Sequence, residues 1–368
     1  MTFLRRFAIR HCSLSRGLGA LSPASLGSVT LHRLGVEKLP SRGRPFTGHN
    51  DTHTSWLHTE TPESVEVDLK RLDGEDTGIA EVLMCRQKAK NALGRVFVSQ
   101  MRELVSSLHH DTAVRVVVFR SLVQGVFCAG ADLKERAEMN HSDSDLFVHG
   151  LRSLMTEIAL LPMPTVAAVD GFALGGGLEL ALACDLRTAA NSAQMGLIET
   201  TRGLLPGAGK TTRSHMRAHT HQLPSCHLSL FGIMSSASFP LYILSPIGGS
   251  QRLPRAVGFA LAKELIFTGR RVDGQRAVDM GLVNRATEQN SDGDAAYREA
   301  LSLAREILPQ APIAVRMAKE AMNRGMEVDI TSGMAIERMC YARVIPTRDR
   351  QEGMAAFIEK RPPRYTGE

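Results

Sequence analysis

Three consecutive glycines, at 175–177, stand between a short β-branched run and an apolar run with helical character. The run before them, Thr165–Val169, is typical of a buried strand, and 180–183 is typical of a buried helix. A strand that passes through glycines into a helix is the local pattern of a parallel α/β fold. Glycines at a helix N-terminus also present bare N–H groups that suit a negatively charged oxygen. Close packing of a helix on a strand requires glycine too, so the glycines alone leave both interpretations open.

The same alternation of strands and helices extends along 65–258, which we expect to be an α/β core. Strands are predicted at 79–85, 114–119 and 165–169, and helices at 95–108 and 147–161. From 259 to 368 the pattern is helical, with candidates at 260–268, 275–280, 294–307, 312–324, 330–342 and 349–360. The apolar runs are too short or too interrupted to predict a membrane helix.

The first 36 residues contain no Asp or Glu but five arginines. A basic, acid-free, Ser-rich N-terminus predicts a mitochondrial transit peptide, which with a linker would occupy 1–64 and direct the protein to the matrix. The alternative is a disordered basic tail that is not a targeting signal. Because much of the net charge of +6 lies here, the charge does not predict nucleic-acid binding.

The cysteines and histidines do not predict a metal site. Six cysteines are scattered, and no two are spaced as C-x-x-C, which argues against a disulfide framework and a Cys-rich zinc site. One cluster holds His215, His219, His221, Cys226 and His227. It lacks the paired half of a zinc finger, so a polar His-rich loop is favoured over zinc. We expect no metal and no redox cofactor.

Two carboxylates follow strand and glycine signals. Glu179 comes one helical turn after Gly176 and has leucines on both sides, an apolar setting that would raise its pKa and suit proton transfer. Glu199 follows the strand-like run 194–198 and precedes a Gly/Pro loop. Two carboxylates can hold one water, with one accepting a proton while the other donates. Taken alone, Glu199 is equally compatible with a surface glutamate at a loop.

These motifs, in this order, resemble those of the crotonase superfamily. The resemblance rests on Cys-Ala-Gly-Ala-Asp-Leu-Lys at 128–134, on Asp170-Gly171, on Gly-Gly-Gly-Leu-Glu-Leu-Ala at 175–181, and on Glu199 with Pro-Gly-Ala-Gly at 206–209. It extends from about residue 65 to the C-terminus. It implies a spiral of ββα units followed by a helical trimerisation region, and trimers or dimers of trimers.

The resemblance also implies roles for individual residues. The N–H groups of Ala131 and Gly176 would form an oxyanion hole for a thioester, and Glu179 and Glu199 would be the catalytic acids. Coenzyme A would be part of the substrate and would be bound by Lys88, Ala89, Lys90, Asn91, Ala131, Asp132, Leu133, Lys134, Gly175, Gly176, Phe357 and Lys360. Phe357 and Lys360 would approach from the C-terminal helices, including those of a neighbouring subunit.

The expected function is hydration of a 2-enoyl-CoA to a 3-hydroxyacyl-CoA in fatty acid or branched acyl-CoA metabolism. Other crotonase-type lyase or isomerase activities remain open. One member of the superfamily binds RNA through a lysine-rich helix face. Here the candidate helix at 95–108 has only Arg95 and Arg102 as cations, and Glu103 offsets one of them, so nucleic-acid binding is not favoured.

The segment at about 210–248 interrupts this resemblance. Joining Gly209 directly to Gly249 restores Pro-Gly-Ala-Gly-Gly-Ser-Gln-Arg, the usual reading of the superfamily. The segment contains no acid and ends in an apolar half, 228–247, that is broken by prolines. We expect an inserted segment that leaves hydratase activity weak or absent, with a regulated but active form as the alternative.

Overall fold

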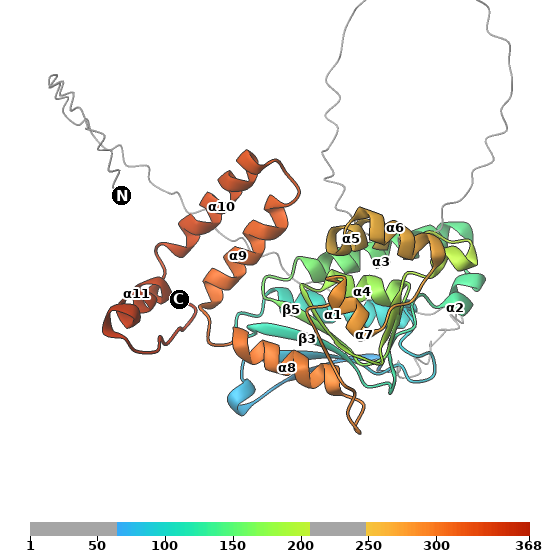
Figure 1. Ribbon diagram of the computed structural model, residues 1–368, viewed down its shortest axis with the longest axis horizontal. Helices are drawn as coiled ribbons and strands as arrows, with labels where there is room; N and C mark the ends of the chain where they lie inside the picture. Colours follow the sequence, from blue (N-terminus) through green and yellow to red (C-terminus); the bar gives the residue numbers. More distant parts are fainter. Residues whose placement is uncertain (1–64, 207–247) are drawn as a thin grey trace, which may run out of the picture. The chain divides into compact units, whose positions relative to one another are not determined.

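The computed structural model describes residues 65–206 and 248–368, which form two β-sheets and their covering helices (Figure 1). The expected transit peptide and linker, the His-rich cluster and nearly all of the expected insert lie outside these residues. The larger sheet has the strand order β1-β2-β3-β5-β7-β9, and the smaller sheet has the order β4-β6-β8. All strand pairs are parallel except β1 with β2.

The strands are short and alternate with helices along the chain. They are β1 (Val67–Arg71), β2 (Ile79–Met84), β3 (Val116–Ser121), β4 (Val126–Cys128), β5 (Thr165–Val169), β6 (Phe172–Leu174), β7 (Leu186–Ala190), β8 (Gln194–Gly196) and β9 (Arg285–Thr287). The first helices are α1 (Arg95–His109), α2 (Leu133–Glu138), α3 (His141–Ala159) and α4 (Gly176–Ala183), with 3-10 turns η1 (Gly74–Asp76) and η2 (Glu199–Arg202). The later helices are α5 (Gly249–Val257), α6 (Phe259–Thr268), α7 (Gly274–Asp279), α8 (Ala295–Ile307), α9 (Pro312–Gly325), α10 (Ile330–Val344) and α11 (Arg348–Glu359).

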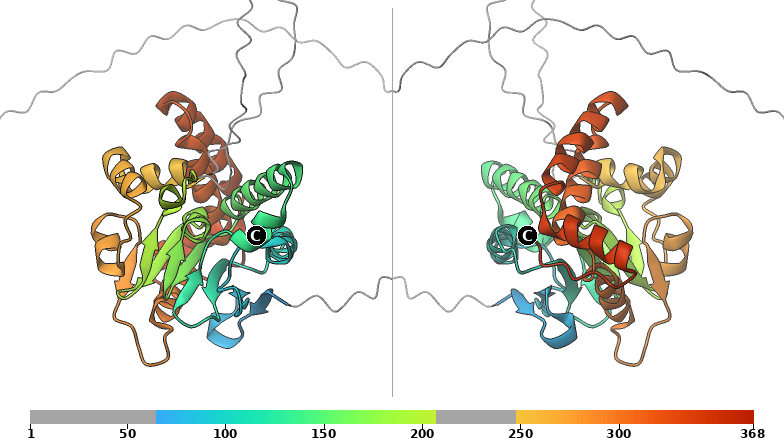
Figure 2. Two further views of the ribbon diagram at one scale, coloured as in Figure 1. Left: turned by 90° about the vertical axis from the view of Figure 1, so that its right-hand side faces the viewer. Right: turned by 90° about the vertical axis from the view of Figure 1, so that its left-hand side faces the viewer.

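The central strands are apolar throughout because both faces of the larger sheet are covered. On β3, Val117 and Phe119 belong to the main core, which includes side chains of α1, α3 and α4. Val116 and Val118 point to the opposite face and form a second cluster with the alanines of α8. A strand buried on both faces loses the apolar–polar alternation of a half-exposed strand. Figure 2 shows the strands of both sheets in the middle of the core, with helices on either side.

The smaller sheet positions the segments that carry the motifs. Its three strands are parallel and adjacent, so their carboxyl ends lie at one edge. The residues after β4 are Ala129–Ala131, those after β6 are the three glycines, and those after β8 lead to Glu199. Loops at the carboxyl ends of parallel strands are the usual place for a binding site in α/β proteins.

Most of the elements expected from the sequence are confirmed, with differences at their ends. Helix α3 begins at His141 rather than at 147, because the Asn140 side chain caps it by accepting a hydrogen bond from the Asp143 N–H. The region 259–368 is not purely helical, since β9 pairs with β7 in the larger sheet. At three residues, β9 is too short for period-two patterning to reveal it. None of the helices in 65–206 and 248–368 is long and apolar enough to cross a membrane.

One partly buried ion pair ties α9 to the strands. Lys319 Nζ lies 2.7 Å from Asp185 Oδ2 and donates to the Met163 carbonyl at 2.9 Å. Asp185 Oδ2 also accepts hydrogen bonds from the N–H and the hydroxyl of Thr165, the first residue of β5. The carboxylate therefore links a strand to a C-terminal helix. Without Lys319, its negative charge would keep only the hydrogen bonds from Thr165 and would have lost its ion-pair partner.

We predict that Lys319→Met lowers the free energy of unfolding by about 2–3 kcal/mol, because Asp185 loses its ion-pair partner. Urea denaturation monitored by circular dichroism measures the change. Lys70→Met, which removes an exposed lysine from the edge strand β1, is the matched control and should alter stability by less than about 0.5 kcal/mol. Equal effects of the two substitutions would contradict the structural role of this pair.

Candidate active site

Two backbone N–H groups meet at the edge of the smaller sheet. Leu93 and Ala131 form a parallel bridge, in which the Leu93 N–H donates to the Gly130 carbonyl and the Leu93 carbonyl accepts from the Asp132 N–H. This pattern uses the groups on either side of Ala131 and directs the Ala131 N–H away from Leu93. Gly176 is the first residue of α4, where an N–H has no partner inside the helix.

Glycine is required here because the two segments touch. A β-carbon on Gly177 would lie 2.1 Å from the Cys128 carbonyl oxygen, and one on Gly176 would lie 3.5 Å from the Ala131 nitrogen. Gly175, just before the helix, has a φ of 53°, a conformation that side chains disfavour. The close approach brings the Ala131 and Gly176 amides together, as an oxyanion hole requires. The glycines thus serve both packing and amide presentation.

Glu179 lies in the first turn of α4 and is 1% exposed. Its Oε1 accepts a hydrogen bond of 2.6 Å from the N–H of Gly249, the first residue of α5. The guanidinium groups of Arg136 and Arg252 interact electrostatically with it. A buried carboxylate with a short N–H hydrogen bond and nearby cations has compensation for its charge.

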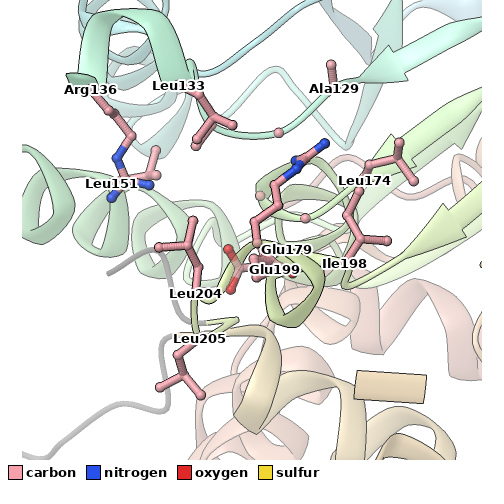
Figure 3. Close-up of a pocket in the computed structure, with 15 residues that line it drawn as sticks. Ala129, Leu133, Arg136, Leu151, Leu174, Glu179, Ile198, Glu199, Leu204 and Leu205 are labelled. Carbon is pink, nitrogen blue, oxygen red and sulfur yellow. The ribbon is translucent and has the colours of Figure 1, made fainter. Parts of the chain in front are cut away.

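Glu199 lies at the start of η2 and faces the same hollow (Figure 3). Burial, and second the neighbouring Glu179 charge, raise the pKa of Glu199 to about 7. Its Oε2 is buried and has no hydrogen-bond partner among the described residues. A carboxyl group whose pKa is near neutral is suited to transfer a proton.

The hollow is apolar apart from these carboxylates, two arginines and the backbone. Its side chains come from the ends of β4, β6 and β8 and from α2, α3, α4 and η2. The lining residues are Ala129, Gly130, Ala131, Leu133, Arg136, Leu151, Leu174, Gly175, Gly176, Glu179, Ile198, Glu199, Arg202, Leu204 and Leu205. The structure therefore brings together Ala131, Gly176, Glu179 and Glu199, which the sequence had connected only through motifs.

Two expected coenzyme A contacts have other roles. Asn91 is fully buried, and its side-chain amide donates to the Ser121 hydroxyl and to the Phe127 carbonyl, so it is not available to a ligand. The Asp132 carboxylate caps α2 and lies 2.8 Å from Arg86 Nη1. Both side chains hold the loops in place, and a contact of these two residues with coenzyme A stays a prediction.

The other expected coenzyme A residues divide into two groups. Ala131, Leu133, Gly175 and Gly176 line the hollow, whereas Lys88, Ala89, Lys90, Lys134, Phe357 and Lys360 do not. Lys90 is nevertheless adjacent, because its carbonyl accepts a hydrogen bond from the Ala129 N–H. Phe357 is 85% exposed on α11. A contact of these outer residues with coenzyme A stays a prediction.

Sequence reasoning missed the arginines and the Gly249 N–H. For Arg136 the sequence does hold a signal. Leu133, an expected site residue, lies three residues before Arg136 on α2, so the two side chains share one side of the helix. Burial of Arg252, whose Nη2 donates to the Met155 carbonyl, had no signal in the sequence. The partner of Glu179 comes from the far side of the expected insert, a pairing that no local pattern predicts.

Comparisons with known proteins identify the family of this chain. The enoyl-CoA hydratase/isomerase family model matches residues 74–223 and 235–368. The chain belongs to the enoyl-CoA hydratase/isomerase family. This membership confirms the crotonase-like fold expected from the motifs. The break at 224–234 falls inside the segment expected to be inserted.

Individual relatives cover most of the chain. It is 56% identical to the mitochondrial enoyl-CoA hydratase domain-containing protein 2 of Mus musculus, over 90% of this chain and 97% of the relative. It is 46% identical to the mitochondrial methylglutaconyl-CoA hydratase of Mus musculus, over 95% and 98% respectively. The crystal structure of an enoyl-CoA hydratase from Bacillus anthracis matches with a TM-score of 0.68 and 36% identity, over 82% of this chain and 100% of that chain.

We predict that Glu199 makes the stability of this family member pH-dependent. The unfolded carboxyl loses its proton near pH 4.5, whereas the folded one keeps it to about pH 7. Between these values the folded state binds more protons, so its stability falls as the pH rises. Glu199→Gln removes this effect. Its free energy of unfolding, relative to wild type, should therefore increase by about 1–3 kcal/mol between pH 4.5 and pH 8.

Urea denaturation of both proteins across this range measures the effect. Glu103→Gln, at an exposed glutamate of α1, is the control and should show no such trend. A difference between Glu199→Gln and wild type that stays constant with pH would contradict the raised pKa.

Proposed function

We propose that the protein hydrates 2-enoyl-CoA thioesters to 3-hydroxyacyl-CoA. The observation that carries the proposal is that Glu179 and Glu199 line one hollow, together with the converging Ala131 and Gly176 backbone. Membership of the enoyl-CoA hydratase/isomerase family supports the thioester as substrate. An isomerase or another lyase of the same family would use the same backbone site, so the two carboxylates favour hydration.

The two amides would act on the thioester carbonyl. Hydrogen bonds from the Ala131 and Gly176 N–H groups withdraw electron density from the carbonyl oxygen and stabilise the enolate formed after addition at C3. Gly176 also places the positive end of α4 at this oxygen. Polarisation of the carbonyl makes C3 electrophilic, which a neutral water requires.

The two glutamates would divide the proton transfers. Glu179, with its Gly249 hydrogen bond and nearby guanidinium groups, is the base that removes a proton from the attacking water. Glu199, with a pKa of about 7, holds a proton at neutral pH and donates it to C2. Water supplies the hydroxyl at C3, and the proton taken by Glu179 returns to Glu199 before the next turnover. The net reaction consumes one water.

The relatives support a mitochondrial location and an acyl-CoA substrate. Proteins 46–59% identical to this chain are named as mitochondrial, and one group of them as methylglutaconyl-CoA hydratases. The arginine-bearing, acid-free N-terminus agrees with import into mitochondria. We place the protein there, in fatty acid or branched acyl-CoA metabolism.

The C-terminal helices support assembly into trimers or dimers of trimers. Met326, Ile330, Phe357 and Ile358 of the region α9–α11 are each at least 79% exposed. Exposed apolar side chains of this density on neighbouring helices are typical of a surface covered by another subunit. Assembly would also bring Phe357 and Lys360 within reach of a neighbouring coenzyme A.

We predict that Glu179→Gln and Glu199→Gln each lower kcat for crotonyl-CoA by about 10²–10⁴-fold, because each removes one proton transfer. Thioester affinity should change little, since glutamine keeps the size of the side chain. Steady-state hydration, followed by loss of the enoyl absorbance, measures kcat. Product analysis should identify the 3-hydroxyacyl-CoA.

Glu103→Gln is the matched control and should retain wild-type kcat. Full turnover by the double variant Glu179→Gln/Glu199→Gln would refute the proposed mechanism. Absence of hydration by wild type, with isomerisation of a 3-enoyl-CoA instead, would favour the isomerase alternative.

We predict that joining Gly209 to Gly249 raises kcat/KM and solubility relative to the full chain. The Gly249 N–H lies 2.6 Å from Glu179, so a displaced chain end at 248–249 acts directly on a catalytic group. A shift of about 1 Å in such a group can lower the rate on the order of a hundredfold. Parallel assays of the two forms measure the effect, and equal kcat/KM with equal solubility would show that the segment does not impair the enzyme.

A further inference from the structure

Arg86 lies two residues beyond β2, and its guanidinium group joins three segments of the chain. Its Nε lies 2.8 Å from Oε1 of Glu66, just before β1. Its Nη1 donates to the Ala92 carbonyl at 2.7 Å and to Oδ2 of Asp132 at 2.8 Å. Its Nη2 lies 2.8 Å from Oε1 of Glu135 on α2. The Arg86 side chain is 16% exposed and does not line the hollow of the candidate active site.

Two of these hydrogen bonds bracket Ala131, one of the two proposed oxyanion-hole residues. Leu93 and Ala131 form a parallel bridge. Ala92 immediately precedes one member of this bridge, and Asp132 immediately follows the other. Because a single nitrogen, Nη1 of Arg86, donates to both, it holds the two backbone segments together beside the Ala131 N–H. A change in the spacing of these segments would move that N–H.

The same contacts fix the start of α2, which follows the bridge. Asp132 uses Oδ1 to cap α2, where it accepts from the N–H groups of Lys134 and Glu135, and it uses Oδ2 for Arg86. Glu135 divides its oxygens in the same way. Its Oε1 faces Arg86, and its Oε2 accepts a hydrogen bond of 2.8 Å from the N–H of Arg95, the first residue of α1. The segment after the oxyanion hole is therefore anchored to α1 and to Arg86.

The charges of this cluster make the guanidinium group difficult to replace. Burial opposes the charge of Arg86, but the carboxylates of Glu66, Asp132 and Glu135 raise its pKa above the usual value, so the group is ionised. A guanidinium group presents its donors in a fixed planar fork, which an ammonium group lacks. Without it, three carboxylates would lie close together with uncompensated charges, and their repulsion would push the start of α2 away from the bridge.

We infer that Arg86 is a positioning residue for the oxyanion hole. It sets the place of the Ala131 N–H through Asp132 and the bridge to Leu93, and it does not touch the substrate. An oxyanion hole with one displaced donor binds the thioester nearly as well but stabilises the enolate less, so the effect belongs mainly to the transition state. This inference rests on the proposed thioester site, but its main test measures a bound carbonyl group without turnover.

The first experiment measures the polarisation of a bound thioester carbonyl by infrared spectroscopy. The probe is butyryl-CoA isotopically labelled at the carbonyl carbon, which cannot be hydrated because its acyl chain has no double bond. On the full wild-type chain, its C=O stretching frequency should fall relative to the free ligand. Arg86→Met should lose most of this shift while still binding the ligand. Arg86→Lys, which keeps the charge without the fork, should retain part of the shift.

A second variant tests the same link from the other side. Asp132→Asn keeps an oxygen that can cap α2, but its amide nitrogen would present a donor to Arg86 in place of an acceptor. It should also lose most of the shift. Poor folding of either variant would reduce the intensity of the carbonyl band but not change its frequency.

Arg305→Met is the matched control. Arg305 also bridges two elements through an ion pair, with its Nε 2.7 Å from Asp76 of η1, and it lies outside the hollow. Its loss should leave the carbonyl frequency unchanged.

The second experiment measures hydration of crotonyl-CoA. Arg86→Met and Asp132→Asn should each lower kcat about tenfold to a hundredfold, because a displacement on the order of 1 Å has an effect of that size. KM should change much less, since the lost interaction is made mainly in the transition state. Arg305→Met should keep the wild-type kcat.

The outcomes separate this inference from the proposed function. An unchanged carbonyl frequency in folded Arg86→Met, or in Asp132→Asn if the first variant does not fold, overturns the role of Arg86 even if wild type hydrates crotonyl-CoA. An equal loss of the shift in Arg305→Met, or no shift in wild type with bound butyryl-CoA, overturns it as well. A shift that depends on Arg86 and Asp132, in a protein that hydrates no enoyl thioester, overturns the hydratase function and supports the positioning role.

Discussion

The shared edge of the three-stranded parallel sheet is the constraint on which the site depends. Three short strands, β4, β6 and β8, deliver Ala131, the glycine turn and Glu199 to one place, because parallel neighbours end at the same edge. The glycines then let α4 approach the end of β4 to within contact of backbone atoms. One contact thus sets both the helix position and the spacing of the two amides. A side chain at 177 would separate them, whatever its chemistry.

The second constraint is the charge balance in an apolar hollow. Two carboxylates cannot both be ionised at low cost when they are buried near each other. Here Glu179 has a short hydrogen bond and two guanidinium groups acting on it, whereas one oxygen of Glu199 lacks a described partner. The environment therefore favours charge on one residue and a proton on the other. The fold produces this difference through the ends of α5 and α2 and not through the glutamates themselves.

The sequence predicted the elements and the four central residues, but not what surrounds them. The strands β2, β3 and β5 are continuously apolar because both of their faces are buried, so they can be recognised from the sequence alone. The Glu179 and Glu199 motifs are local as well. The buried hydrogen bonds of Asn91 and the helix cap formed by Asp132 were not predicted, because a motif does not show whether a polar side chain points inward to the protein. Arg136, Arg252 and Gly249 escaped notice because their relation to Glu179 arises only from tertiary packing.

The site and the fold depend on the chain around 206–249 to different degrees. The Ser250 N–H donates to the Pro206 carbonyl at 3.3 Å, so the two described ends remain adjacent. Closing a loop of about 40 residues between adjacent ends costs only a few kcal/mol of entropy, and that cost grows slowly with length. The strands lie away from these ends, since β8 ends at Gly196 and β9 begins at Arg285. Glu179 is closer to them, because its hydrogen-bond donor, the Gly249 N–H, belongs to the second described residue after the segment. A perturbation there that is negligible for folding acts through a single hydrogen bond on Glu179, the proposed catalytic base, so activity is expected to be the more sensitive property of the two.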